Sequence, residues 1–116
     1  MTNDSLEVPA TADLAHLTVE VVPGDDLGVQ SIRAYADDGD VVTLTWDEFA
    51  RAVTVSWRAP DLERLRIERE LATKVSVSDE RGAVVFRCWS EGVGFGGTLV
   101  VRVAERVTVS DVTLRG

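Results

Sequence analysis

The amino-acid sequence predicts a mainly β protein: an antiparallel sandwich or open barrel of about eight or nine short strands, with at most one short helix. Apolar and polar residues alternate with a period of two along most of the chain, as they do in strands that bury one face. Gly, Pro and Asp interrupt this pattern roughly every eight to twelve residues, which is a spacing typical of turns between short strands. The 116 residues suffice for one hydrophobic core.

The first strands are predicted around two turns. Residues 17–21 read Leu-Thr-Val-Glu-Val, with an apolar residue at every second position. The segment Pro23–Asp26 supplies turn chemistry, because Pro and Gly interrupt a strand ladder and Asp bonds to the nearby backbone. Next, Val29–Tyr35 and Val41–Trp46 flank Asp37-Asp38-Gly39-Asp40. This pattern predicts a hairpin, since Gly accepts a positive φ.

The one short helix is predicted near residues 46–52. Thr45 and Glu48 stand three residues apart, as in a capping box, where the hydroxyl caps the helix and the carboxylate bonds back to the cap. Val53–Trp57 follows as an alternating strand, and Pro60 ends it.

Residues 61–73 resemble a helix in composition, because Leu, Glu and Arg are frequent. At 100° per residue, however, the apolar side chains spread over opposite sides of the helix and no stripe forms. With a period of two, most of them share one face. We therefore predict strands here, with a bend near residues 70–73.

The second half of the chain predicts two strand pairs. Val75–Ser78 and Ala83–Trp89 should form an antiparallel hairpin around Asp79–Gly82, because Gly adopts the left-handed conformation that such a turn requires. Thr98–Val103 and Val107–Leu114 should form a final pair.

The charge distribution is the most informative feature of the composition. The net charge is −8 at pH 7, which argues against a nucleic-acid partner, because a phosphate backbone requires a basic surface. Eleven acids and one base, Arg33, fall within residues 1–48, whereas residues 49–116 hold nine acids and eleven bases. An acidic half of this kind favours a basic protein as partner.

The ends of the sequence suggest a domain organisation. We expect residues 1–13 to form a polar tail and residues 14–116 to form a single β-rich domain. No run approaches the roughly 18 apolar residues of a membrane span, so no membrane partner is expected. The first residues lack the basic and apolar segments of a secretory signal. The single cysteine cannot form an internal disulfide, which fits a cytoplasmic location.

The turn carboxylates Asp37, Asp38 and Asp40 are the first candidate binding residues. Their spacing, like that of Asp25 and Asp26, matches no calcium loop, so no metal site is expected. Two interpretations remain open. The carboxylates form one acidic patch that steers a basic partner, or they are solvated turn formers that lie beside arginines and cancel their charge.

The glycine-rich string Gly92–Gly97 supplies the next candidates. A phosphate-binding glycine loop opens a helix, but here a strand follows, which favours a hairpin connection. Gly94 and Phe95 stay candidates because glycine loops at the mouth of a barrel also contact small ligands. Trp89 is the best aromatic candidate, since it falls on the face opposite Phe86, which is predicted to be core.

The nucleophile candidates are weak. His16 is the only histidine and Cys88 the only cysteine, whereas triads and most zinc sites need several such groups together. Cys88 shares the face of Phe86, which predicts a buried structural thiol. No catalytic residue and no cofactor is predicted. The favoured function is a non-catalytic protein-interaction module. The alternatives are a small-molecule-binding β-barrel with a glycine-rich mouth loop and a small carboxylate-dependent enzyme.

Overall fold

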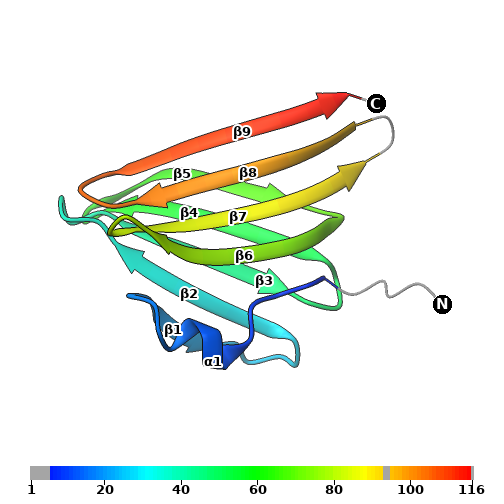
Figure 1. Cartoon of the computed structure of the whole chain (residues 1–116), viewed down its shortest axis with the longest axis horizontal. Helices are drawn as coiled ribbons and strands as arrows, with labels where there is room; N and C mark the ends of the chain where they lie inside the picture. Colours follow the sequence, from blue (N-terminus) through cyan, green and yellow to red (C-terminus); the bar gives the residue numbers. More distant parts are fainter. Residues whose placement is uncertain (1–5, 93–94, 116) are drawn as a thin grey trace.

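The computed structural model describes residues 6–92 and 95–115, and the statements below concern these residues. Nine strands form two antiparallel sheets that pack face to face (Figure 1). The sheets do not close into a barrel, so of the two predicted architectures the sandwich is confirmed. The elements are α1 (Thr11–Leu14), β1 (Glu20–Pro23), β2 (Val29–Tyr35), β3 (Val41–Asp47), β4 (Ala52–Ala59), β5 (Leu62–Arg69), β6 (Ala72–Glu80), β7 (Ala83–Gly92), β8 (Phe95–Val103) and β9 (Val107–Arg115).

Each sheet is a simple meander. One sheet has the order β1-β2-β3-β4-β5 and the other β6-β7-β8-β9, so every neighbour in a sheet is also the next strand along the chain. The connection from β5 to β6 passes from one sheet to the other at the bend predicted near residues 70–73, where Leu71 has a φ of 55°. Within each sheet, adjacent strands are joined by short connections. The connections therefore gather at the two ends of the sandwich.

The predicted hairpin of β6 and β7 is confirmed. Val75 lies opposite Cys88 and Ser78 lies opposite Val85. Arg81 and Gly82 both have a positive φ, 57° and 84°, as in the two-residue turns that match the twist of a hairpin. Alternate residues of this hairpin point inward. Together with inward-pointing residues of the other sheet, they fill the space between the sheets. The largest fully buried side chains include Trp46, Phe86, Ile32 and Leu44.

The predicted position of the short helix is wrong. Residues up to Asp47 continue β3, and α1 lies instead at Thr11–Leu14. Thr45 does not cap a helix, because its hydroxyl shares a hydrogen bond of 2.7 Å with Ser31 on the neighbouring strand. Trp46 is buried in the core. The capping-box pattern therefore loses to the burial of β3, since packing overrides a four-residue motif.

The N-terminal segment is attached to both sheets. The Leu6 N–H donates to the Glu48 carbonyl (3.2 Å), and the Glu7 N–H donates to the Thr73 carbonyl (3.1 Å). Leu6 and Leu14 are buried in the core. Leu6, which lies within the tail expected at 1–13, thus contributes to the packed core. In the described part of the chain, no helix is both long and apolar enough to span a membrane.

Candidate functional site

One end of the sandwich collects acidic residues and exposed apolar side chains. The register brings together the β1–β2 turn, the β3–β4 turn, the β5–β6 connection and the end of β7, because Val29 lies opposite Asp47 and Val53 lies opposite Arg69. The turns and connections here, with the adjoining residues Asp47 and Glu91, hold six acidic residues and one arginine, while Arg69 at the end of β5 is paired with Asp111. We name this region the acidic end, and its members are Asp25, Asp26, Leu27, Gly28, Asp47, Glu48, Phe49, Ala50, Arg51, Glu70, Leu71 and Glu91.

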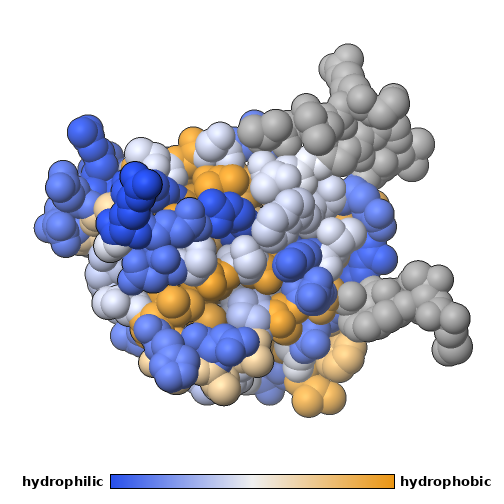
Figure 2. Space-filling model, viewed as in Figure 1, coloured by the Kyte–Doolittle hydropathy of each residue, from blue (hydrophilic) through white to orange (hydrophobic). Residues whose placement is uncertain are grey.

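Three large apolar side chains of the acidic end are exposed, and Leu71, at 50%, is the least exposed of them. Leu27 is 87% exposed and Phe49 is 66% exposed. The Phe49 ring lies against Gly28, since a Cβ atom added to this glycine would stand 2.7 Å from two ring carbons. Figure 2 shows hydrophobic atoms at the lower right, over the β1–β2 turn. Contiguous exposed apolar patches rimmed by polar residues are typical of surfaces that bind other proteins.

The backbone holds this surface in one conformation. The Asp47 carboxylate accepts hydrogen bonds from the N–H groups of Phe49 (3.1 Å) and Ala50 (3.0 Å), which fixes the β3–β4 turn. The Glu48 N–H donates to the Gly28 carbonyl (2.9 Å) and so joins this turn to the β1–β2 turn. A surface that is already ordered loses less conformational entropy when it binds.

Asp37 and Asp38, and Asp40 beside them, lie at the opposite end of the sandwich. The single strand β2 separates their turn from that of Asp25 and Asp26. Asp40 is buried at 5% exposure, and its Oδ2 accepts hydrogen bonds from Trp57 Nε1 (2.9 Å) and Arg64 Nε (3.1 Å). Asp38 Oδ1 accepts the Asp40 N–H (2.9 Å). These two carboxylates thus serve the local fold, and Asp37 stays exposed.

Charges of both signs meet at this opposite end. The Asp37 and Asp38 N–H groups donate to the carbonyls of Ala104 and Glu105 in the β8–β9 turn. A cleft of about 570 Å³ opens there. Its charged lining residues are Asp37, Asp79, Arg81, Arg102, Glu105 and Arg106. Three acids and three bases at one place largely cancel at a distance, so at this end the geometry favours the turn-former interpretation over an acidic patch.

Replacement of Asp40 should destabilise the fold. We expect Asp40→Ala to lower the free energy of unfolding by about 1–3 kcal/mol, because the indole N–H of Trp57 loses its acceptor in a partly buried place. Denaturant unfolding measures this loss. Asp37→Ala is the matched control and should change stability by less than about 0.5 kcal/mol. Equal losses in the two variants would contradict the role given to Asp40.

Trp89 lies on the outer face of the β6–β9 sheet, opposite Lys74 in the register. The Lys74 ammonium stands 5.3 Å from the centre of the Trp89 ring, a distance at which a cation attracts the ring face. Trp89 is only half-exposed, so part of its contact area is already used within the chain.

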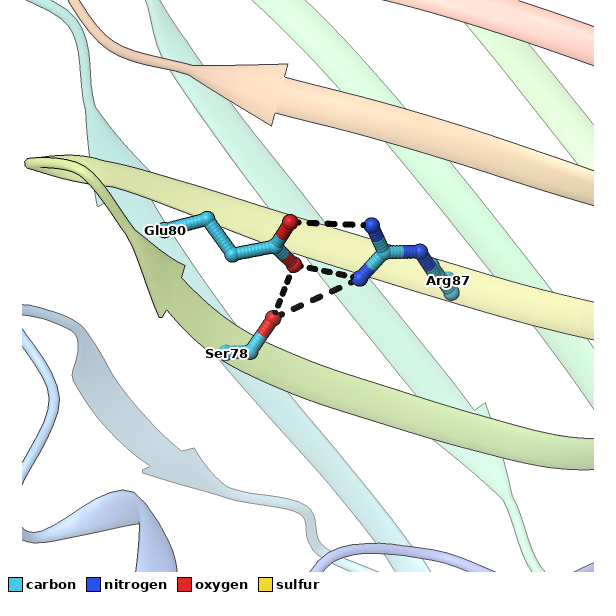
Figure 3. Close-up of polar contacts among 3 residues, drawn as sticks. All are labelled: Ser78, Glu80 and Arg87. Atoms are coloured by element: carbon cyan, nitrogen blue, oxygen red, sulfur yellow. Dashed lines mark hydrogen bonds and ion pairs between the residues drawn. The ribbon is translucent and has the colours of Figure 1, made fainter.

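Further along this outer face, Arg87 and Glu80 form a two-pronged ion pair (Figure 3). Ser78 donates to the same carboxylate at 2.6 Å. The hydrogen bonds from Arg87 and Ser78 lower the pKa of Glu80 to about 2. Glu80 therefore stays ionised at neutral pH and is paired within the sheet.

The remaining candidates belong to the β7–β8 hairpin. Gly94 lies outside the described residues. Phe95 begins β8 and pairs with Gly92, and Glu91 pairs with Gly96. The strands on both sides of the glycine-rich string thus pair directly with each other, as expected for a hairpin connection.

Cys88 is buried at 3% exposure, as predicted. Burial raises the pKa of its thiol to about 11, so at neutral pH the thiolate is scarce. We expect the native protein to resist alkylation by iodoacetamide at pH 7 for hours, while protein unfolded in denaturant reacts within minutes. Mass spectrometry measures the modified fraction. Rapid labelling of the native protein would contradict burial and would restore the nucleophile hypothesis.

The sequence interpretation missed Leu27 and Phe49. Leu27 is the one apolar residue in the string Gly24-Asp25-Asp26-Leu27-Gly28, and a large apolar residue inside a polar turn is a signal that alternation analysis ignores. Phe49 falls within the helix predicted near residues 46–52, which does not form. Among the residues that the structure describes, no group of three or more His, Cys, Asp or Glu residues is placed to hold a metal ion.

Comparison with known proteins relates this chain to one kind of fold. No protein-family model and no curated protein matches the sequence. A solved structure is similar, the "Contact-dependent growth inhibition toxin - immunity protein complex from Klebsiella pneumoniae 342". One of its chains superposes with a TM-score of 0.77 over 94% of this chain and 97% of that chain, at 11% sequence identity. This similarity shows a shared sandwich fold.

Proposed function

We propose that this protein is a non-catalytic protein-interaction module whose acidic end binds a basic partner protein. The observation that carries the proposal is the combination of Leu27 and Phe49, both strongly exposed, with the six acidic residues of the acidic end. Apolar side chains at the centre of an interface supply most of the affinity. Surrounding charges select a partner of opposite sign and speed its approach.

The fold comparison supports this class of function. The similar chain comes from a complex of a growth inhibition toxin with an immunity protein, so in that case the fold takes part in an association of two proteins. The charge distribution indicates the sign of the partner's charge. The acidic end has one arginine, Arg51, and its guanidinium is 3.4 Å from Glu91. The region therefore keeps a strong net negative charge that attracts a basic surface.

Site-specific cross-linking in the cells that produce the protein tests the proposal. A photo-reactive benzoylphenylalanine replaces Phe49 in one variant and Tyr35 in the matched control. Tyr35 is also an exposed aromatic residue, at 56%, but it ends β2 next to the Asp37 turn at the opposite end. We expect position 49 to cross-link to a protein of net positive charge and position 35 to give little product.

Salt and charge neutralisation give a second measurement on the captured partner. We expect Asp25→Asn with Asp26→Asn to slow association at low salt, and the difference should fade as the screening length falls to about 8 Å at physiological ionic strength. Asp37→Asn is the control at the opposite end. Equal cross-linking at positions 49 and 35, or an acidic partner, would overturn the proposed function.

A further inference from the structure

A groove of about 420 Å³ opens beside the acidic end, between residues 8–11 and the β1–β2 turn. Its lining is mixed: apolar side chains (Val8, Pro9, Pro23, Val29 and Trp46) alternate with polar backbone and with Thr11 and Gln30. Gly24 and Gly28 line it without side chains. Among the described residues of its lining, Glu48 is the only charged one.

Backbone hydrogen bonds build the groove, and one of them also orders the acidic end. The Gly24 N–H donates to the Val29 carbonyl (3.0 Å), and the Val29 N–H donates to the Asp26 carbonyl (3.2 Å), which closes the turn along one wall. The backbone of Glu48 makes two hydrogen bonds. Its N–H donates to the Gly28 carbonyl (2.9 Å), and its carbonyl accepts the Leu6 N–H (3.2 Å). Backbone hydrogen bonds therefore connect Glu48 both to the β1–β2 turn and to the N-terminal segment, which lie on the two sides of the groove.

Acidic residues lie beside the groove, while one base, Lys74, lines a neighbouring hollow that shares Val8, Pro9 and Ala10 with it. Asp25 and Asp26 follow Gly24 directly and are exposed, so their negative charges lie next to the turn wall. A groove that combines apolar wall residues with one acidic residue, and that has further acids nearby, suits a side chain with a long methylene stem and a positive head. The cleft at the opposite end differs, because its charged lining residues are evenly divided in sign.

We propose that this groove receives an arginine side chain of the basic partner. The inference rests on the proposed function and specifies how the partner is recognised. The methylene stem packs against the apolar residues of the walls, and the guanidinium donates hydrogen bonds to the Glu48 carboxylate. Arginine suits the site better than lysine, because its guanidinium is less strongly hydrated and its planar fork matches a carboxylate.

Small probes of the arginine side chain test the groove without the partner. The probe is N-acetyl-arginine N-methylamide, added to the ¹⁵N-labelled full chain while amide chemical shifts are recorded. The neutral, nearly isosteric citrulline analogue tests the charge, and guanidinium chloride tests the stem. We expect the arginine probe to shift the amides of Gly24, Gly28 and Glu48, with binding about tenfold tighter than that of either control.

Variants locate the effect. Ala10→Trp places a large side chain in the groove, and Ala12→Trp is the matched control, because Ala12 is exposed on α1 and does not line the groove. We expect Ala10→Trp to abolish the shifts and Ala12→Trp to retain them. Glu48→Gln should weaken the arginine probe about tenfold, whereas Glu105→Gln at the opposite end should not. Glu48→Gln alone decides the matter if Ala10→Trp does not fold.

The outcomes separate this inference from the proposed function. Equal shifts with the arginine and citrulline probes, or shifts unchanged by Glu48→Gln, would overturn the arginine groove. The cross-linking result at position 49 is independent of them, so the module could still bind a basic partner through Leu27 and Phe49. Conversely, arginine-specific shifts without position-specific cross-linking would support the groove and contradict the wider docking surface.

Discussion

Phe86→Ala should lower the free energy of unfolding by about 3–5 kcal/mol, the usual cost of deleting a buried aromatic ring. Phe86 is 2% exposed and lies on the central strand β7, between Val77 of β6 and Val101 of β8. Removal of the ring leaves a cavity between the two sheets that neighbouring strands cannot fill without losing their pairing. Equilibrium unfolding in urea measures the change.

Phe49→Ala is the matched control, because it deletes the same side chain at a position that is 66% exposed. We expect a loss of less than about 1 kcal/mol, since little apolar area returns to water. Similar losses at both positions would mean that the core is not centred on Phe86 as the structure has it.

Phe49→Ser should weaken binding to the basic partner by about thirtyfold, the equivalent of a hot-spot loss of about 2 kcal/mol. We expect this loss because the Phe49 ring is exposed and lies against Gly28. Most of the change should appear in the dissociation rate, as is usual for contacts at the centre of an interface. Surface plasmon resonance with the captured partner measures both rates.

Tyr35→Ser controls for the general loss of an exposed aromatic residue, and it should change the dissociation constant by less than about threefold. Circular dichroism confirms that each variant keeps its fold. A change below about threefold for Phe49→Ser would remove Phe49 from the interface, and binding would then depend on the charged residues alone.

The alternation of apolar and polar residues predicted most strands that bury one face, but the first, predicted at 17–21, is found at Glu20–Pro23. The β6–β7 hairpin was predicted because the parity of Val84, Phe86 and Cys88 agreed with the turn at Asp79–Gly82, and both strand pairing and burial confirm it. Counting angles favoured strands over a helix at residues 61–73, and the structure has β5 and β6 there. Such agreement between levels is what makes a local pattern reliable.

Short sequence motifs predicted the local structure poorly where tertiary contacts compete with them. The capping-box pattern at Thr45 predicted a helix, yet burial of Trp46 and pairing of β3 with both neighbours keep these residues extended. The sequence alone does not distinguish the roles of the Asp37, Asp38 and Asp40 carboxylates. In the structure Asp40 is buried against Trp57 and Arg64, whereas Asp37 is exposed.

The sequence by itself determined the class of the fold and the sign of the charge, because alternation with a period of two and the count of ionisable groups depend only on the order and identity of residues. Only the tertiary structure decided which acids lie together. The register places Asp25 and Asp26 beside Glu48 at one end and places Asp37 among arginines at the other. The tertiary structure also decided that Leu27 and Phe49 are exposed, because the exposure of a side chain depends on how the rest of the chain packs around it.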